Sequence, residues 1–502
     1  MNLVQHWFSE KECLQLQLDT HIQANIAQQQ QCISALFNEQ LWVIFAREVT
    51  VKDLTWLSYT IRESFQIGQI QADAQASFTI LIAKYVGIES AALIQAGSHK
   101  NITKKTDSDS LVIQLVDSIL LKAYQHGASD IHFENTIDGL VIKNRVDGVL
   151  VENKAAVINV PAEHVISRLK VLAELDIAER RIPQDGRLTV HLDEYDIDLR
   201  ISIMPGLHGE DAVLRILDKQ ALTQDDKPLT LELLGFDAQT MVDIRNLSKQ
   251  PYGMMLVTGP TGSGKTTTLY ALLHEQHDGQ QKIITIEDPV EYQIKGTLQI
   301  PVNEKKGLTF ARGLRSILRH DPDKILVGEI RDHETAAIAV QAALTGHLVY
   351  TSVHANHALD VIGRFRHMEI DLFGFVSSLN GIIAQRLIRL NCPQCKKPVK
   401  VDAETIQYSG ILLEDAENYQ FYQGQGCEHC QGTGYKGRQA IAEVLIMDDE
   451  LRELMIHNAP MSQIRKRLAE QGMKFLRQQA LAVVASGQST LQEINRVTFV
   501  ER

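Results

Sequence analysis

The pattern of hydrophobic and polar residues along the chain predicts three folded regions separated by two polar links. The segments 97–110 and 221–230 are polar and have no apolar periodicity, which is typical of linkers. They leave an N-terminal domain over 1–96, a middle domain over 111–220 and a C-terminal domain over 231–502. The length of 502 residues agrees with this division, because a domain usually takes about 100–200 residues.

The middle region has the pattern of an α+β domain. Apolar residues at helical spacing from Leu111 to Tyr124 predict a helix that ends before Gly127. The residues that follow alternate as in strands and contain turn signals such as Asp147-Gly148. The expected strands are 130–134, 140–146, 187–192 and 196–204.

In the C-terminal region, short apolar strands alternate with helices, which predicts an α/β fold built on a parallel sheet with covering helices. Residues 391–435 carry cysteines and are expected to form a subdomain. Residues 436–502 are expected to be a helical C-terminal region. The expected strands are 254–258, 282–286, 325–327 and 348–352, and the expected helices are 269–274, 310–319, 334–344, 462–471 and 476–486.

Composition and charge exclude several classes of protein. Hydrophobic residues make up 44% of the chain and charged residues 22%, which is close to the average of soluble globular proteins. The formal net charge of −12 lacks the basic excess that is usual in nucleic-acid binders, so no nucleic acid is expected as a partner. We find neither an apolar run long enough for a membrane span nor a signal-peptide layout, and we expect a cytoplasmic protein.

The stretch from Gly259 to Thr266 fits the eight-residue phosphate-loop pattern, between an apolar strand and the start of a helix. Glycines let backbone N–H groups surround a polyphosphate at the positive end of the helix. Lys265 is expected to reach the β- and γ-phosphates, and the Thr266 hydroxyl is expected to bind Mg²⁺. The sequence therefore predicts a nucleoside triphosphate site made by Gly259, Pro260, Thr261, Gly262, Ser263, Gly264, Lys265, Thr266 and Thr267.

Two apolar strands end in carboxylates at what should be one edge of the sheet. Glu329 follows the strand at 325–327, and Glu287 and Asp288 follow the strand at 282–286. A phosphate-loop enzyme needs a carboxylate near Mg²⁺, and open α/β sheets bind ligands at the carboxyl ends of their strands. We expect Glu329 to organise Mg²⁺ and Glu287 to help position water, while the spacing leaves open which acid is the general base.

His347 and His354 flank the strand expected at 348–352. Beside a nucleotide site, such a pair could sense the γ-phosphate. Two packed core histidines would fit the same pattern, and the sequence leaves both interpretations open.

The six cysteines include two CxxC pairs, Cys392/Cys395 and Cys427/Cys430. Each pair can supply one edge of a tetrahedron, so the four thiolates together predict a structural Zn²⁺ site. Cys13 and Cys32 are expected to be buried thiols outside this cluster.

Several of these motifs, in this order, resemble the secretion and pilus-assembly traffic ATPases, and in particular the type II secretion ATPase and the type IV pilus extension ATPase. The resemblance covers about residues 111–500. It rests on the segments 130–134, 185–187, 259–266, 286–291, 326–332 and 345–356.

The resemblance implies a cytoplasmic ATPase that forms a homo-hexamer, with a RecA-like core preceded by a PAS-like α+β domain and a small N-terminal domain. It makes Gly259–Thr266 the Walker A motif, Glu287 and its neighbours the Asp box, and Glu329 the Walker B acid. It makes His347 and His354 the His box and gives Arg200 and Arg215 contacts to the nucleotide. The implied partners are the cytoplasmic domain of an inner-membrane anchor protein, which would meet residues 1–96, and an inner-membrane platform protein, so that ATP hydrolysis drives pseudopilus assembly.

The sequence departs from the family pattern at a few positions, and rival functions stay open. Lys143-Asn144-Arg145 and Val353-His354-Ala355-Asn356 differ from the usual motifs, but they keep most of the charged and imidazole positions. The opening of a dinucleotide-sensing domain, found in some pilus relatives, is missing, which favours secretion over pilus extension. A nucleic-acid translocase and a non-hydrolysing scaffold are the rivals from other classes. For a translocase the sequence offers only Arg312, Arg315 and Arg319 on one helix, without stacking aromatic residues.

Overall fold

The structure is a computed structural model, and the predicted links fall largely outside the residues that it describes. Residues 97–106 of the first link and residues 221–228 of the second link lie outside the described residues. The described residues are 6–13, 16–19, 22, 32–38, 40–46, 49, 57, 65–71, 107–153, 160–192, 195–217 and 229–500.

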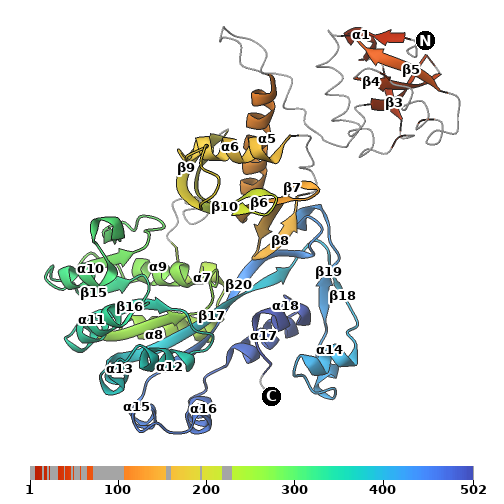
Figure 1. Ribbon diagram of the computed structural model, residues 1–502. Helices are drawn as coiled ribbons and strands as arrows, with labels where there is room; N and C mark the ends of the chain where they lie inside the picture. Colours follow the sequence, from red (N-terminus) through yellow and green to blue (C-terminus); the bar gives the residue numbers. More distant parts are fainter. Residues whose placement is uncertain are drawn as a thin grey trace.

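The N-terminal region contains a five-stranded sheet in the order β1-β5-β4-β3-β2, drawn in red in Figure 1. Strand β4 is apolar on both faces, with Trp42 and Ile44 in one hydrophobic cluster and Val43 and Phe45 in another. Because successive side chains point to opposite faces of a sheet, a continuous apolar strand buries both of its faces. Cys13 and Cys32 are both buried, as expected. The elements are β1 (His6–Phe8), α1 (Glu10–Cys13), β2 (Gln17–Asp19), β3 (Cys32–Phe37), β4 (Gln40–Phe45) and β5 (Gln66–Ile70).

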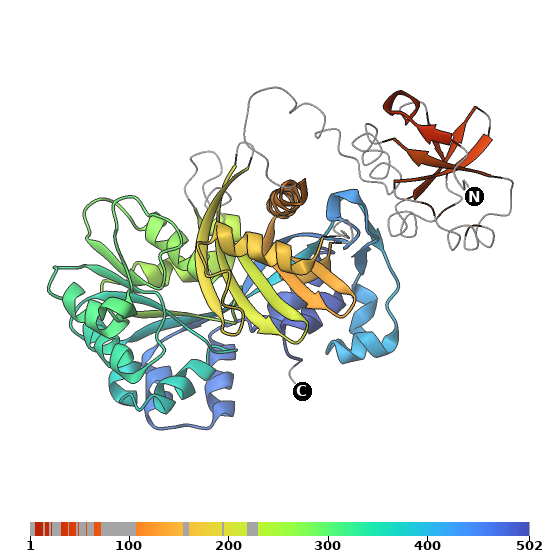
Figure 2. The ribbon, with the colours of Figure 1, turned by 45° about the horizontal axis from the view of Figure 1, so that its top comes forward.

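The middle domain is a six-stranded antiparallel sheet in the order β8-β7-β6-β11-β10-β9, with α5 and α6 on one face (Figure 2). Helix α5 begins at Asp107, inside the segment that the sequence predicts as a link. In β10 the alternate residues Leu199 and Ile201 are buried in the core with α5 and α6, so Arg200 lies on the opposite face of the sheet. The elements are α5 (Asp107–Gln125), β6 (Ala128–Thr136), β7 (Gly139–Val146), β8 (Val149–Glu152), α6 (Ala162–Leu172), β9 (Gln184–Leu192), β10 (Tyr195–Gly206) and β11 (Gly209–Leu217).

The C-terminal domain is built on a seven-stranded sheet in the order β14-β13-β15-β16-β12-β17-β20. All neighbouring strands are parallel except β17 and β20, so the parallel sheet expected from the sequence is confirmed. Helices α10 to α13 pack on one face and α8 and α9 on the other. The strands are β12 (Gly253–Thr258), β13 (Ile283–Glu287), β14 (Leu298–Pro301), β15 (Lys324–Val327), β16 (Leu348–Val353), β17 (Leu379–Asn391) and β20 (Tyr435–Ile446), and the helices are α7 (Leu231–Leu234), α8 (Ala238–Ser248), α9 (Lys265–Glu275), α10 (Phe310–Ile317), α11 (His333–Leu344), α12 (Asp360–His367) and α13 (Leu372–Ser378).

The expectation that 436–502 is purely helical is wrong at its start. Strand β20 occupies Tyr435–Ile446 and pairs antiparallel with β17, which makes a long ribbon at the edge of the sheet. Polar residues in the first part of β20, and Glu443 within its buried part, obscure the strand pattern in the sequence. The cysteine-bearing segment connects the two strands in the sequence. It lies at the opposite end of the sheet from α10 (Figure 1). The remaining elements are β18 (Lys396–Pro398), α14 (Ala403–Tyr408), β19 (Tyr422–Gly424), α15 (Asp449–Ile456), α16 (Met461–Glu470), α17 (Leu476–Ala485) and α18 (Leu491–Val497).

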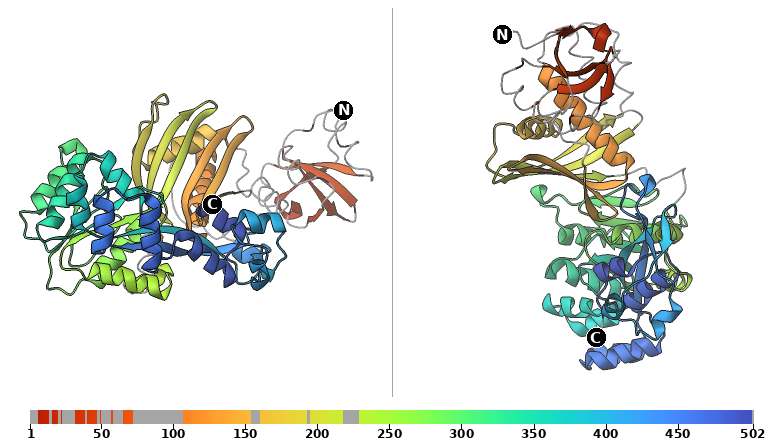
Figure 3. Two further views of the ribbon diagram at one scale, coloured as in Figure 1. Left: turned by 90° about the horizontal axis from the view of Figure 1, so that it is seen from below. Right: turned by 90° about the vertical axis from the view of Figure 1, so that its right-hand side faces the viewer.

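The sheet of the middle domain lies between its own helices and the C-terminal domain (Figure 3). The turn between β7 and β8 contacts the start of β20, where Asp147 accepts a hydrogen bond from the Gly437 amide at 3.0 Å and pairs with Arg438 at 3.2 Å. Within the described residues, no helix combines the length and the apolar character that crossing a membrane requires.

Candidate nucleotide site and cysteine cluster

The predicted phosphate loop lies at the carboxyl end of β12, directly before α9. Gly262 and Gly264 have φ values of +77° and +85°, which favour glycine, and Gly264 is the N-cap of α9. At Gly259 (φ +150°) a Cβ atom would lie 2.6 Å from the Gln385 carbonyl oxygen and 2.6 Å from Ser263 Oγ, so this position has no room for a side chain. The first amides of a helix lack intrahelical partners, and this loop can therefore offer them to an anion.

The Lys265 side chain folds back over this loop. Its Nζ donates hydrogen bonds to the carbonyl oxygens of Gly259 at 2.9 Å and Pro260 at 3.1 Å. Burial lowers the pKa of Lys265 to about 8, and the nearby carboxylate of Glu329 opposes this shift. The ammonium group is therefore held above the loop, within reach of a bound polyphosphate. Thr266 and Thr267 are half-buried on the first turn of α9.

Glu329 follows β15 and brings a carboxylate close to Lys265. One carboxylate oxygen pairs with Arg331, and the other lies 3.6 Å from Nε2 of His354. Desolvation lowers the pKa of His354, and the positive charge of Lys265 acts in the same direction. Lys265, Glu329 and His354 thus meet at one edge of the sheet, although they come from three different strand ends.

Thr258, the last residue of β12, holds the turn that carries His354. Its hydroxyl lies 3.0 Å from the carbonyl oxygens of Val353 and Ala355 and accepts a hydrogen bond from the Ala355 amide at 2.8 Å. Because β12 and β16 are parallel, this contact joins two loops at the same end of the sheet.

His347 lies away from this site, contrary to the pairing predicted with His354. In the parallel register, Leu348 pairs with Gly253 at the start of β12, whereas Val353 pairs with Thr258 beside the phosphate loop. His347 therefore lies at the amino edge of the sheet, and its Nδ1 is 3.0 Å from the Ala342 carbonyl oxygen. Within this chain the strand itself separates His347 from the phosphate loop.

The environment of Glu287 also differs from the prediction that this residue helps to position water. Its side chain is only 3% exposed, and Tyr270 of α9 donates a hydrogen bond to Oε2. Thr285 at 2.5 Å and Gln299 at 3.2 Å donate to Oε1. The Tyr270 oxygen also accepts a hydrogen bond from the Glu291 amide at 3.4 Å. Glu287 is thus an anchor for the turn after β13, which leaves its oxygens little freedom to bind a reacting water.

Arg200 and Arg215 are neighbours on β10 and β11, on the sheet face opposite α5 and α6. Arg215 Nε donates to Asp130 Oδ1 at 2.9 Å. Desolvation lowers the pKa of Arg200, whereas Glu291 and Asp288 of the C-terminal domain act in the opposite direction. Both arginines line an open hollow of about 470 Å³ together with Arg187, Asp130 and Asp185. Arginines therefore outnumber carboxylates on this face, which lies toward the turn after β13.

The four predicted zinc ligands come together at the end of the β17–β20 ribbon, just beyond the pair Asn391–Tyr435. The Sγ–Sγ distances are 3.8 Å for Cys392–Cys427, 3.8 Å for Cys395–Cys430 and 3.7 Å for Cys427–Cys430. A tetrahedron with zinc–sulfur bonds of about 2.3 Å has edges of about 3.8 Å, so these thiols fit Zn²⁺. Cys430 Sγ also accepts hydrogen bonds from the amides of Cys427 and Gly434, which would stabilise a thiolate.

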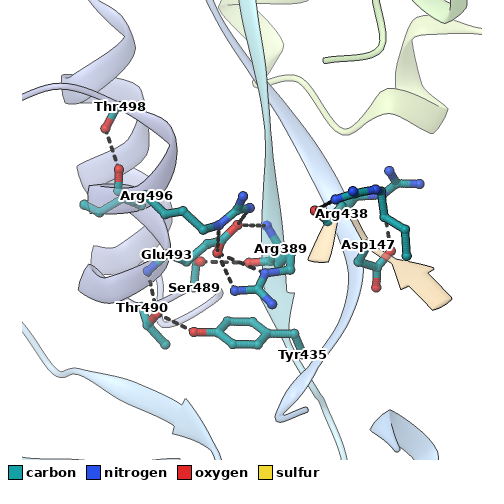
Figure 4. A network of polar contacts seen from close by, with 12 residues as sticks. Asp147, Arg389, Tyr435, Arg438, Ser489, Thr490, Glu493, Arg496 and Thr498 are labelled. Carbon is teal, nitrogen blue, oxygen red and sulfur yellow. Dashed lines mark hydrogen bonds and ion pairs between the residues drawn. The ribbon is translucent and has the colours of Figure 1, made fainter. Parts of the chain in front are cut away.

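A polar network joins the base of this cluster to the C-terminal helix α18 (Figure 4). Glu493 is fully buried and accepts hydrogen bonds from Arg389 of β17 and from Arg496. Arg389 also lies over the ring of Tyr435, 4.1 Å from its centroid. Arg389 is the β17 partner of Arg438 on β20, so this network lies next to the contact between Arg438 and Asp147.

The sequence prediction missed Gln385, whose side chain contacts the phosphate loop. Gln385 lies in β17 and is fully buried, and its Nε2 donates to the Ser263 carbonyl oxygen at 2.6 Å. The available signal was the polar pair Gln385-Arg386 inside the otherwise apolar stretch from Ile382 to Ile388. A buried amide in such a run requires hydrogen-bond partners from elsewhere.

Comparison with known proteins places this geometry in a family. Residues 105–496 match the family described as Type II/IV secretion system protein. The Vibrio cholerae protein named type II secretion system ATPase E is 45% identical over 394 residues, which cover 78% of this chain and 76% of that protein. The Myxococcus xanthus protein named type IV pilus assembly ATPase PilB is 43% identical over 409 residues, which cover 79% and 70%.

A solved structure is similar in fold over most of the chain. The pilus retraction motor PilT with bound ADP is 25% identical, and it matches 76% of this chain and 96% of its own with a TM-score of 0.51. With a family match that spans most of the sequence and relatives above 40% identity, the chain belongs to the type II/IV secretion system protein family, as a relative of its type II secretion and type IV pilus ATPases.

Proposed function

We propose that this protein is the cytoplasmic ATPase motor that drives pseudopilus assembly in type II protein secretion. The observation that carries the proposal is the convergence of the Gly259–Thr266 loop, Lys265, Glu329 and His354 at the carboxyl edge of one parallel sheet. The similarity to the Vibrio cholerae type II secretion system ATPase E supports it.

In this function the loop amides and Lys265 bind the phosphates of ATP. Mg²⁺, when bound, neutralises charge on the β- and γ-phosphates. The Thr266 hydroxyl and the Glu329 carboxylate would hold this ion. His354 lies next to Glu329, where its imidazole can contact the γ-phosphate. Glu287 supports the site from within, through Tyr270 and the turn that leads to Glu291.

Arg200 and Arg215 would supply positive charge from the middle domain. Arginines that approach the phosphates neutralise the charge that develops in the transition state. Their position on a separate domain, facing Asp288 and Glu291, allows a domain movement to bring them in or withdraw them. We propose a PAS-like middle domain and a RecA-like core that work in this way within a homo-hexamer, since head-to-tail contacts that close produce rings.

The four cysteines would hold a structural Zn²⁺ that closes the end of the β17–β20 ribbon. The segment from Cys392 to Gly434 is a long insertion that begins and ends beside this cluster. Zinc binding to four thiolates contributes about 10–16 kcal/mol in zinc-finger peptides, which is enough to order a segment with a small core.

The proposed partners are the cytoplasmic domain of an inner-membrane anchor protein, which would bind the N-terminal region, and an inner-membrane platform protein. The protein would then act at the cytoplasmic face of the inner membrane through these partners. Pilus extension is the second candidate, favoured by the match to the Myxococcus xanthus PilB. Deletion of the gene separates the two, since loss of protein secretion with normal surface pili supports secretion and the reverse supports pilus extension.

A nucleic-acid translocase receives little support from the basic helix α10. Arg315 pairs with Glu334, and Arg312 and Arg319 donate to the carbonyl oxygens of Gly307 and Arg315. The three arginines therefore already have hydrogen-bond partners within this chain. ATPase stimulation by DNA would favour this rival.

The substitution Glu329→Gln tests the catalytic assignment in the full-length protein. We expect kcat to fall by about 10²-fold or more, because the charge that organises Mg²⁺ is removed, while ATP binding stays within a few-fold of the wild type. Phosphate release measures kcat, and isothermal titration calorimetry measures ATP affinity. Glu334→Gln is the matched control, since Glu334 is an exposed acid on α11 that pairs with Arg315. Unchanged turnover in Glu329→Gln would refute the assignment.

A further inference from the structure

Two adjacent residues of β17 bind the two loops that form the nucleotide site. Gln385 contacts the phosphate loop, and Arg386 contacts the turn that carries His354. Gln385 is fully buried and Arg386 is 6% exposed, although both are polar and lie within a strand that has neighbours on both sides. Polar side chains in such a place require specific partners, because an unpaired buried polar group is costly.

The hydrogen bonds of Gln385 fix the direction of its amide. Nε2 donates to the Ser263 carbonyl oxygen at 2.6 Å, and Oε1 accepts from the Thr268 hydroxyl at 2.8 Å. A carbonyl oxygen can only accept, whereas a hydroxyl can donate or accept, so only this orientation satisfies both contacts. The side chain thereby bridges the phosphate loop and the helix that follows it.

The contact with Ser263 also orients the next backbone amide. In a planar trans peptide the C=O and the N–H point in opposite directions. When the Ser263 carbonyl points to Gln385, the Gly264 N–H points away from β17, as an amide that binds phosphate must. Glycines on both sides of Ser263, with φ values of +77° and +85°, allow this peptide to rotate at little cost. The side chain of Gln385 removes that freedom.

Arg386 connects the same strand to the second loop. Its guanidinium donates to the Gln385 carbonyl oxygen at 3.0 Å and to the Asn356 carbonyl oxygen at 2.8 Å. The Gln385 carbonyl oxygen is one of the two atoms that leave no room for a side chain at Gly259. The two residues therefore set the distance between the phosphate loop and the His354 turn from a single strand.

We propose that Gln385 is a positioning residue for ATP hydrolysis, which holds the Ser263–Gly264 peptide so that the Gly264 amide faces the phosphates. The proposal rests on the function of Gly259–Thr266 as the phosphate loop. It assigns to β17 a role that no chemical motif in the sequence marks.

The test compares Gln385→Met with Gln479→Met in the full-length protein. Gln479 is a matched control, because it is a buried glutamine whose Nε2 bonds to Thr240 at 3.1 Å and to the Ala442 carbonyl at 3.3 Å, on α17 and away from the loop. We expect Gln385→Met to weaken binding of Mg²⁺-ATP by about tenfold or more, and Gln479→Met by less than about twofold. Calorimetry measures both affinities, and thermal unfolding shows whether the two variants lose similar stability. Equal affinities for the two variants would overturn the proposal.

A second pair of substitutions covers the case in which Gln385→Met does not fold. Thr268→Val removes only the hydroxyl that donates to Gln385, whereas Thr268→Ser keeps it. We expect weaker ATP binding in Thr268→Val and affinity near that of the wild type in Thr268→Ser. Equal affinity in both would overturn the proposal.

Lys265→Ala separates this inference from the proposed function. If Lys265→Ala binds ATP normally, the phosphate-loop assignment fails. If it loses binding while the Gln385 and Thr268 variants keep theirs, only the role of Gln385 fails.

Discussion

At the scale of single residues, burial and neighbouring charge set the chemistry of the nucleotide site. Lys265 combines a lowered pKa with a position over the phosphate loop. Because the ammonium group is partly buried, fewer solvent molecules screen its attraction to phosphate. Glu287 shows the opposite outcome, since protein donors occupy its two oxygens and leave it a supporting role.

The pKa of Lys265, at about 8, predicts how ATP affinity depends on pH. The protonated side chain attracts the phosphates, and bound phosphate shifts its lowered pKa upward again. Affinity should therefore be greatest below pH 8 and fall by up to about tenfold per pH unit above it. Calorimetry between pH 7 and pH 9.5 checks the trend. In two buffers of different ionisation enthalpy at pH 8.5, binding should take up protons. Binding without proton uptake would contradict this account.

At the scale of elements, the β17–β20 ribbon organises two separate sites. Its middle contacts the phosphate loop through Gln385, and its end carries the four cysteines. Near the cysteines the backbone passes so closely that a Cβ on Gly424 would lie 1.9 Å from the Gly434 carbonyl oxygen. Such a crossing requires glycine and is secured by the cluster beside it.

Removal of the proposed Zn²⁺ should affect the inserted segment more than the candidate nucleotide site. We expect the purified protein to contain one Zn²⁺ per chain and Cys427→Ser to lose it, because a tetrahedral site needs its four ligands. Hydrogen exchange over 392–434 should then accelerate, while ATP affinity changes by less than about threefold. Elemental analysis and exchange mass spectrometry measure these outcomes. Cys13→Ser, at the end of helix α1 in the N-terminal region, is the control that keeps its zinc. A Cys427→Ser variant with full zinc content would exclude the site.

At the scale of the whole molecule, the middle domain faces the C-terminal domain with its basic surface. Arg200 approaches Asp288 and Glu291, and Asp147 meets Arg438 and the Gly437 amide. The second contact lies beside the polar network that joins the ribbon to α18 (Figure 4). A change in the angle between the domains would therefore alter the distance between the arginines and the proposed nucleotide site.

Arg200→Ala should separate catalysis from binding. We expect kcat to fall by at least about 10²-fold, because charge that stabilises the transition state is lost, while ATP affinity changes only a few-fold. Steady-state kinetics and calorimetry on the assembled protein measure the two effects. Arg181→Ala is the control, since Arg181 is a highly exposed arginine of the same domain that pairs with Glu179. Loss of binding without loss of kcat would show that Arg200 only holds the substrate.

Much of the fold could be predicted because neighbouring residues in the sequence carry its signal. The strands β12, β13, β15 and β16 and the helices between them follow from short apolar runs and helical spacing. The ribbon of β17 and β20 was missed, because an insertion of many residues separates its two strands and polar residues interrupt β20.

The sequence by itself determined the chemistry that depends on spacing along the chain, namely the Gly259–Thr266 loop and the two CxxC pairs. Only the tertiary structure decided the roles that depend on strand direction and burial. Parallel pairing of β12 with β16 brings His354 to the phosphate loop and leaves His347 at the far edge. Burial makes Glu287 an anchor, and a strand distant in sequence supplies Gln385. The physical reason is that a local motif fixes backbone geometry within a few residues, whereas the partners of a side chain are set by which elements pack against it.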